Sequence, residues 1–152
     1  MAKAKSPMSR SENMSRIRSK DTAPELFVRR GLHARGFRFR VHRHDLPGRP
    51  DLVLTRWHAV IQVHGCYWHG HDCLGRASKT NTEYWGPKIA RNRERDARNE
   101  AALRDAGWRV LIVWECCLKG PGRWAPDELL DRIADWVRGE DGFAELEGSR
   151  PA

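Results

Sequence analysis

Thiol and imidazole side chains are concentrated in residues 66–73, which have the sequence Cys-Tyr-Trp-His-Gly-His-Asp-Cys. These groups hold zinc in tetrahedral structural sites, which usually have four such ligands. Three ligands come from this segment: Cys66, His71 and Cys73. Either Cys116 or Cys117 can complete the set, and because adjacent residues of an extended segment point to opposite sides, only one of them can easily join. The spacing predicts a zinc site that joins two distant parts of the chain.

Two histidines near these ligands are candidates for proton transfer. Histidine has an ordinary pKa of about 6.5, so His64 or His69 could take a proton from an attacking water near neutral pH. His69 lies between two predicted zinc ligands and could itself bind zinc. We favour the base, because the other four ligands already complete a tetrahedron.

Two carboxylates are candidates for a second metal site. Asp51 follows the turn at residues 46–50 and opens an apolar strand, so its carboxylate is expected at a sheet end. Mg²⁺ takes oxygen ligands, often only one or two from protein. Taken alone, the Pro-Asp pair more often marks an ordinary turn aspartate than a metal ligand. Glu25 could face the same metal or pair with Thr22 in a helix capping box, and these two roles compete for one side chain.

Charge points to a polyanionic partner. The chain of 152 residues has 28 Lys and Arg against 20 Asp and Glu, a net charge of +8, which favours phosphate contacts and counterion release. Trp68 lies in a Gly- and His-rich loop and Trp85 lies beside Tyr84, and aromatics among basic residues stack on bases or wedge between them. We expect a cytoplasmic protein with reduced cysteines, because neither a signal peptide nor a membrane span is evident.

The elements that position these residues suggest one α/β domain at residues 21–139, between a basic, partly disordered arm (1–20) and a disordered tail (140–152). Helices are expected from Thr22 to about Arg35, from Tyr84 to Ala106 and from about Pro126. Strands are expected at residues 37–41, 51–54, 59–64 and 108–114. This order predicts a mixed central sheet flanked by helices.

Together these residues resemble the very-short-patch-repair (Vsr) family of DNA mismatch endonucleases. The matching segments are 13–17 (Asn-Met-Ser-Arg-Ile), 46–51 (Leu-Pro-Gly-Arg-Pro-Asp), 64–69 (His-Gly-Cys-Tyr-Trp-His), 71–73 (His-Asp-Cys), 82–85 (Thr-Glu-Tyr-Trp) and 107–116 (Gly-Trp-Arg-Val-Leu-Ile-Val-Trp-Glu-Cys). They occur in order over about residues 11–138, so the resemblance is specific although no single segment is. It implies a restriction-endonuclease-like fold with a structural zinc, and a monomeric enzyme that nicks DNA beside the T of a T·G mismatch left by deamination of 5-methylcytosine.

The resemblance also implies roles by position. Asp51 and the backbone carbonyl of Val63 hold Mg²⁺, and His69 activates water with support from Glu25 and His64. The implied zinc ligands are Cys66, His71, Cys73 and Cys116. The implied DNA contacts are Met14, Arg16, Tyr67, Trp68 and Trp85, with mismatch-repair proteins as further partners and the nucleoid as the location on DNA. The chain departs from the family in having Val63 for threonine, Tyr67 for phenylalanine and an extra thiol at Cys117.

Two other functions compete with the mismatch nuclease. The first is a restriction-type endonuclease of the same fold that cuts intact sites. The second is a zinc-stabilised DNA-binding module without catalysis, in which the histidines are structural. The aromatic loop favours a mismatch over an intact site, because a wedge gains most where pairing is already weak. Asp51 together with His69 favours either nuclease over the binding module.

Overall fold

A mixed five-stranded sheet forms the centre of the computed structural model, which describes residues 22–66 and 82–148 and, for residues 82–85, the backbone alone. The strand order is β1-β2-β3-β4-β5. The strands are β1 (Arg40–Val41), β2 (Leu52–Leu54), β3 (Ala59–His64), β4 (Arg109–Trp114) and β5 (Phe143–Leu146). Strands β1 to β3 pair antiparallel, whereas β3, β4 and β5 run parallel. The prediction of a mixed central sheet is confirmed.

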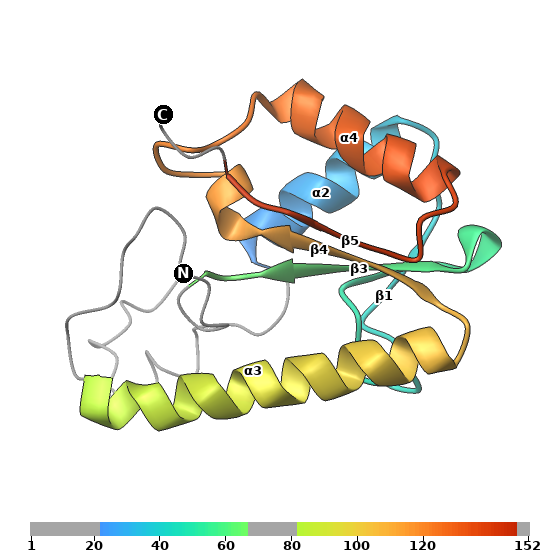
Figure 1. The fold of residues 1–152 in the computed structure, drawn as a ribbon. Helices are drawn as coiled ribbons and strands as arrows, with labels where there is room; N and C mark the ends of the chain where they lie inside the picture. Colours follow the sequence, from blue (N-terminus) through green and yellow to red (C-terminus); the bar gives the residue numbers. More distant parts are fainter. Residues whose placement is uncertain (1–21, 67–81, 149–152) are drawn as a thin grey trace, which may run out of the picture.

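Helices cover both faces of this sheet (Figure 1). The helices are α2 (Ala23–Ala34), α3 (Thr82–Asp105) and α4 (Pro126–Arg138), with short 3-10 turns η1 (Thr55–Trp57) and η3 (Glu115–Cys117). Helices α2 and α4 lie side by side on one face, and the long α3 crosses the other (Figure 1). In the part of the chain that the structure describes, none of the helices has the length and apolar character needed to cross a membrane.

Each layer has its own apolar core. The core between the sheet and helices α2 and α4 is built around Val28, Leu32, Leu52, Leu54, Ile61, Leu111, Leu129 and Ile133. The core on the α3 side is built around Val53, Val60, Leu103, Val110 and Ile112. Successive residues of each central strand alternate between the two cores, as the two-residue period of a strand requires. The sheet is therefore buried on both faces, which fixes the positions of its strand ends.

The ends of α2 are set by local sequence. Thr22 is the N-cap, and its hydroxyl accepts a hydrogen bond from the backbone N–H of Glu25 over 3.4 Å. The helix stops before Gly36, whose φ of +92° is a left-handed conformation that favours glycine. Both limits were predicted. They matter to the site because they place Glu25 in the first helical turn, over the end of the sheet.

The turn before β2 is held by α3. Residues 46–50 turn with the backbone N–H of Arg49 donating to the carbonyl of Leu46 over 3.2 Å. Gly48 has a φ of +72°, and a Cβ atom there would lie 2.9 Å from the Cβ of Asn99 in α3. A glycine is therefore required for both its backbone conformation and its close contact. This packing fixes the point at which Asp51 enters the sheet.

Two parts of the expected organisation are wrong. The strand predicted at residues 37–41 is limited to Arg40–Val41, because the backbone N–H of Phe37 donates to the Leu32 carbonyl at the end of α2 and its ring packs in the α2–α4 core. The disordered tail predicted from residue 140 instead contains β5, a parallel edge strand next to β4. Leu146 is buried there with 7% of its surface exposed, so apolar packing as well as backbone pairing holds this strand.

Candidate metal centre at the end of the sheet

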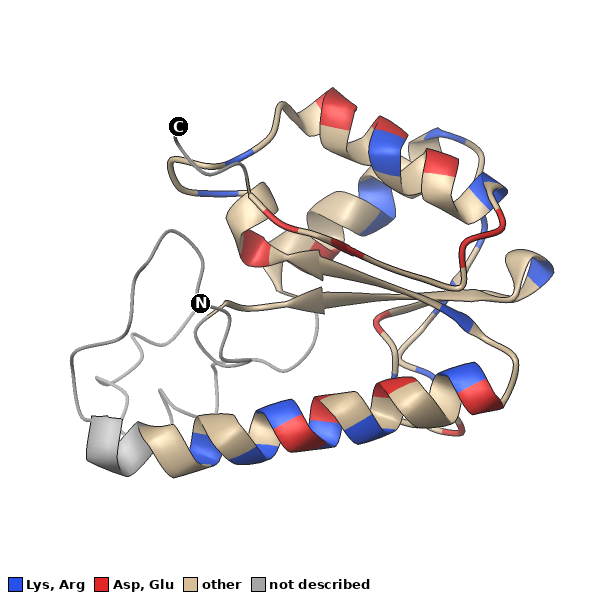
Figure 2. Ribbon diagram, viewed as in Figure 1, with Lys and Arg blue, Asp and Glu red and all other residues tan. Residues whose placement is uncertain are grey.

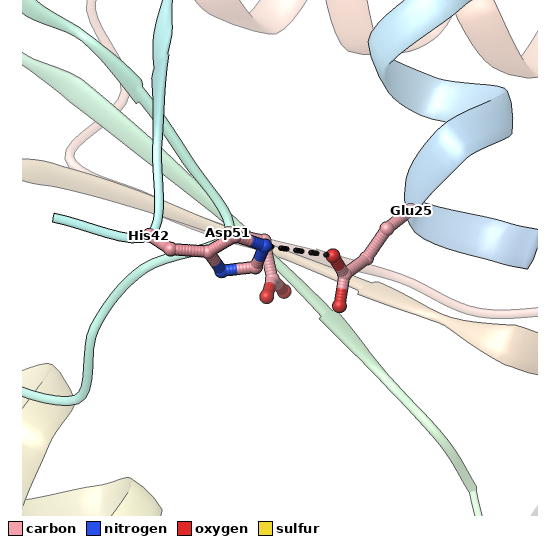
Figure 3. Close-up of side chains that lie close together, drawn as sticks. All are labelled: Glu25, His42 and Asp51. Carbon is pink, nitrogen blue, oxygen red and sulfur yellow. Dashed lines mark ion pairs between the residues drawn. The ribbon is translucent and has the colours of Figure 1, made fainter. Parts of the chain in front are cut away.

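Three potential metal ligands meet at one end of the sheet: Glu25, His42 and Asp51 (Figure 3). One ligand atom from each lies within 4.8 Å of the others. Glu25 comes from the first turn of α2, His42 follows β1, and Asp51 precedes β2. Both carboxylates are buried, with 2% of Glu25 and 6% of Asp51 exposed. The group thus has two oxygen donors and one nitrogen donor beneath the protein surface.

Asp51 is anchored by the neighbouring strand. Its Oδ2 atom accepts a hydrogen bond from the backbone N–H of Val63 over 2.6 Å. The antiparallel register, in which Leu52 faces Ile61, brings these two residues together. The contact places the backbone of Val63 beside the Asp51 carboxylate. A role for the Val63 carbonyl as a neighbouring metal ligand remains a prediction.

The environment of Asp51 opposes its negative charge. Burial raises the pKa of Asp51 well above its ordinary value, and the negative charge of Glu25 raises this pKa further. The hydrogen bond from Val63 acts in the opposite direction but does not cancel these effects. Two carboxylates in a buried site concentrate negative charge, and a bound cation or a shared proton relieves it. The donor set fits a divalent cation, because carboxylates are its usual ligands and imidazole suits transition ions.

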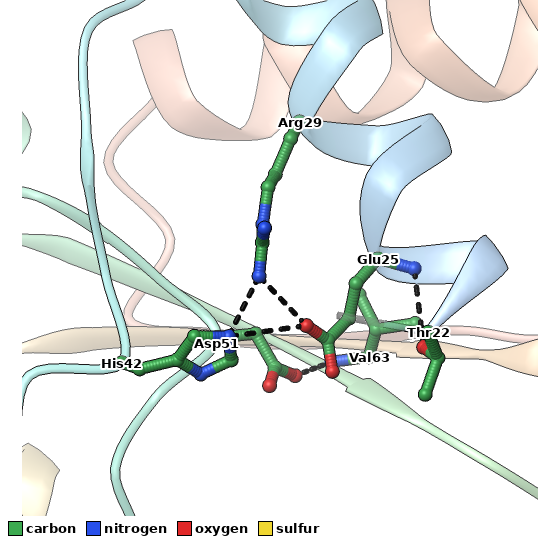
Figure 4. Close-up of polar contacts among 6 residues, drawn as sticks. All are labelled: Thr22, Glu25, Arg29, His42, Asp51 and Val63. Carbon is green, nitrogen blue, oxygen red and sulfur yellow. Dashed lines mark hydrogen bonds and ion pairs between the residues drawn. The ribbon is translucent and has the colours of Figure 1, made fainter. Parts of the chain in front are cut away.

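Arg29, one helical turn after Glu25 in α2, contacts both Glu25 and His42 (Figure 4). Its Nη2 atom lies 2.9 Å from Glu25 Oε2 and 2.7 Å from His42 Nε2. His42 Nε2 is itself 3.4 Å from the same Glu25 oxygen. These contacts place the side chain of Glu25 in the site, while its backbone N–H takes part in the helix cap.

Sequence reasoning missed Arg29 and His42. A Glu–Arg pair four residues apart on one helix was a visible signal for the first. No spacing pointed to His42, which reaches the site because its backbone adopts a left-handed φ of +50° directly after β1. Histidine is one of the few non-glycine residues enriched in that conformation.

His64 lies near the same end of the sheet but outside this group of ligands. It is the last residue of β3, has 6% of its surface exposed, and its ring meets Trp114 edge-on with centroids 5.3 Å apart. Trp114 is its register partner on β4. The structure thus gives His64 a clear packing role, and its supporting role in catalysis remains a prediction.

The two adjacent cysteines point into different cores, as expected. Cys116 belongs to the α3-side core, and Cys66 packs against that core. Cys117 lies in the α2–α4 core, where burial raises the pKa of its thiol to about 12. Cys66 and Cys116 therefore share one side of the sheet, and Cys117 faces away from them. This arrangement fits the predicted zinc set.

Several residues predicted to act in the site lie outside the described residues. They are Met14, Arg16, Tyr67, Trp68, His69, His71 and Cys73. The backbone of Trp85 lies in the first turn of α3, whereas its side chain is outside the described part. Their roles remain predictions.

Comparison with known proteins identifies the family. The model of the family described as DNA mismatch endonuclease Vsr matches residues 3–75. The DNA mismatch endonuclease Vsr of Escherichia coli is 43% identical over 148 residues, which cover 97% of this chain and 95% of that protein. A type II nicking enzyme of Xanthomonas oryzae, V.XorIIP, is 52% identical over 118 residues, 77% of this chain and 87% of that protein. A third relative, the type II nicking enzyme V.NmeAIP of Neisseria meningitidis, is 46% identical over 72% of this chain and 79% of its own length. With this agreement over most of its length, the chain belongs to the Vsr family of DNA mismatch endonucleases.

Proposed function

We propose that this protein is a DNA nicking endonuclease that cuts one strand beside the T of a T·G mismatch and so starts very short patch repair. Relatives named as a mismatch endonuclease and as nicking enzymes support nicking of DNA. The observation that carries a catalytic function is the buried pair of carboxylates at the sheet end, Glu25 and Asp51. A binding module that needs only a folded surface has no use for two buried acids, whose burial is costly.

Mg²⁺ is the metal proposed for this centre. Asp51, the Val63 carbonyl and Glu25 are the groups that would hold it, directly or through water. When bound, the ion would polarise the scissile phosphate and stabilise charge that develops as the bond breaks. Hydrolysis of a phosphodiester also needs removal of a proton from the attacking water. We assign that step to His69, with His64 supporting it from the end of β3.

Zinc and the aromatic residues serve recognition in this proposal. Cys66, His71, Cys73 and Cys116 would bind one zinc, which would fasten the loop at residues 67–81 to the end of β4. The family and a mixed sheet with acids at one end support a restriction-endonuclease-like fold. Tyr67, Trp68 and Trp85 would enter the base stack beside the mismatch, while Met14 and Arg16 would contact DNA from the arm.

Strand-labelled nicking assays test the proposal. A T·G duplex, its T·A match and its C·G parent would each be incubated with zinc-loaded protein, with and without Mg²⁺. We expect Mg²⁺-dependent cleavage of the T-containing strand of the T·G duplex alone. Equal cleavage of the matched duplexes would instead indicate a restriction-type nuclease, and binding without cleavage would indicate a DNA-binding module.

His69→Ala tests the assignment of the base. We expect loss of nicking while zinc content and DNA binding persist. In the parent protein the rate should rise with pH through the pKa of a histidine and then level off, because the base must be deprotonated to accept a proton. Release of zinc from the variant would show that His69 is a ligand and not the base.

A further inference from the structure

Arg29 places a positive charge at the two donor atoms that would hold a cation in this site. Its Nη2 atom is within hydrogen-bonding distance of both Glu25 Oε2, at 2.9 Å, and His42 Nε2, at 2.7 Å (Figure 4). The carboxylate oxygen and the imidazole nitrogen therefore converge on one cationic point. Because these two atoms stabilise the positive charge of the guanidinium, they could stabilise the charge of a metal ion at the same position.

The same contact suits His42 Nε2 to an acceptor role. A guanidinium has only donors, so in the tautomer that carries its proton on Nδ1 the lone pair of Nε2 faces Arg29. Histidine binds metals through such a lone pair.

His42 is also held in place. Only 14% of its side chain is exposed, and its left-handed backbone directs the ring from the end of β1 over the carboxylates. Figure 3 shows its ring edge facing Glu25, with Asp51 between the two elements. A polar ring that is largely buried against two acids is placed to interact with what they bind.

We propose that His42 is a nitrogen ligand of the catalytic metal in this chain, and that Arg29 is the cation that leaves Glu25 and His42 when the metal enters. The inference rests on the proposed function and goes beyond it, because it changes the expected donor set from oxygen alone to oxygen and nitrogen. Imidazole favours first-row transition ions over Mg²⁺, which takes oxygen ligands. His42 therefore broadens the metals that this centre accepts.

Mn²⁺ binding to the zinc-loaded protein tests the ligand directly. Electron spin echo envelope modulation of bound Mn²⁺ detects a coordinated ¹⁴N nucleus without any need for activity. We expect ¹⁴N modulation in the parent protein and its loss in His42→Asn, with Mn²⁺ affinity lower by about tenfold or more. Asparagine tolerates a left-handed backbone and offers no imidazole nitrogen. His44→Asn, an exposed position in the same segment, should change neither signal.

Arg29→Met provides a second test whose sign is decisive. If the guanidinium competes with metal, its removal should make Mn²⁺ bind severalfold more tightly. If Arg29 and His42 only hold Glu25 in place, the same change should weaken binding. Weaker binding in Arg29→Met, absence of ¹⁴N modulation in the parent protein, or its persistence in folded His42→Asn would each overturn the proposal.

Nicking assays on the same preparations separate this proposal from the proposed function. Parent protein that nicks the T·G duplex but binds Mn²⁺ through oxygen alone would overturn the role of His42 and leave the function intact. Parent protein that shows the nitrogen ligand but nicks no duplex would overturn the function and leave the metal site intact.

Discussion

Asp51 and Glu25 place two carboxylates that repel each other in an otherwise well-packed molecule. Both side chains are buried, and the pKa of Asp51 is raised by burial and by the charge of Glu25. A group whose folded-state pKa is raised contributes stability below its ordinary pKa and loses it as the pH rises through the raised value. At neutral pH the two buried carboxylates therefore lower the free energy of unfolding, as is common where an active site needs a strained arrangement.

Asp51→Asn should remove the destabilising repulsion between the two carboxylates and should also remove the nicking activity. Asparagine keeps an oxygen that can accept the Val63 N–H and carries no charge. We expect nicking to fall by about 100-fold or more, as loss of a metal contact implies. Without added Mg²⁺, the variant should be more stable than the parent protein by about 0.5–2 kcal/mol at neutral pH.

Urea unfolding at several pH values checks the sign of this effect. The gain in unfolding free energy should vanish below the ordinary pKa of an aspartate and grow as the pH rises through the raised pKa of Asp51. A gain that is the same at every pH would show that the charge of Asp51 is not its cause. DNA binding by the variant, measured alongside, confirms that the surface is intact.

Individual residues of this site differed in how far the sequence revealed them. Glu25 and Asp51 could be found because each stands at a recognisable boundary, a helix start and a strand start. Arg29 and His42 could not be assigned to the site from the sequence alone. Their contact joins α2 to the segment after β1 and depends on a backbone conformation at His42 that no pattern of residue types specified.

At the scale of elements, the sheet separates the thiols. Cys116 faces the α3-side core with Cys66, and Cys117 faces the other core with a thiol pKa of about 12. Burial on the side of the sheet away from Cys66 leaves Cys117 poorly placed to join the zinc ligands. We expect Cys116→Ser to lose the single zinc and Cys117→Ser to retain it, as measured by metal analysis. Zinc retained only in the Cys116 variant would reverse the assignment.

The edge strand β5 should contribute to stability in spite of its place near the C-terminus. Leu146→Ala removes a buried side chain that packs on the α2–α4 core, and we expect a loss of about 2–5 kcal/mol in unfolding free energy. Glu145→Ala in the same strand changes an exposed side chain and should alter stability by no more than about 0.5 kcal/mol. Equal, negligible effects from both changes would mean that the strand is not formed in solution.

Elements with long apolar or periodic patterns were predictable, whereas the bounds of the two edge strands were not. The strand at residues 59–64 and the helices around it were expected nearly at their observed bounds. The β5 segment Phe-Ala-Glu-Leu is only four residues long and follows glycines and acids, so its pairing depends on the exposed edge of β4 rather than on its own sequence. Tertiary contact likewise shortens the strand before His42.

Across the whole molecule, basic residues should supply affinity for any DNA duplex, whereas aromatic residues should supply discrimination between mismatched and matched duplexes. Figure 2 shows basic and acidic positions interleaved along α3. The exposed basic residues of this helix are Lys88, Arg91, Arg93, Arg95, Arg98 and Arg104. With a net charge of +8, the protein is expected to bind any duplex through phosphate contacts that weaken as salt rises. Recognition of a mismatch must come from other groups.

Trp68→Ala and Arg16→Ala should separate the two contributions. Unstacking costs a few kcal/mol per step and stacking on an aromatic returns about 1–3 kcal/mol, so under the proposed function the weaker stacking of a T·G step would decide whether Trp68 inserts. Trp68→Ala should lose preference for T·G over T·A more than it loses total binding. Arg16→Ala should weaken both complexes alike and reduce the salt slope by about one. A folded Trp68→Ala protein that keeps the parent preference would contradict the wedge.

Gly148 links the last strand to a cysteine. Its backbone N–H donates to Cys116 Sγ over 3.1 Å, and a Cβ atom there would lie only 2.5 Å from the Cys116 carbonyl oxygen. Strand β5, which ends two residues earlier, is therefore fastened to the sulfur. Amide hydrogen exchange in residues 143–146 should accelerate when oxidation of Cys116 disrupts this hydrogen bond. Hydrogen exchange at this edge of the sheet would then report the oxidation of a buried cysteine.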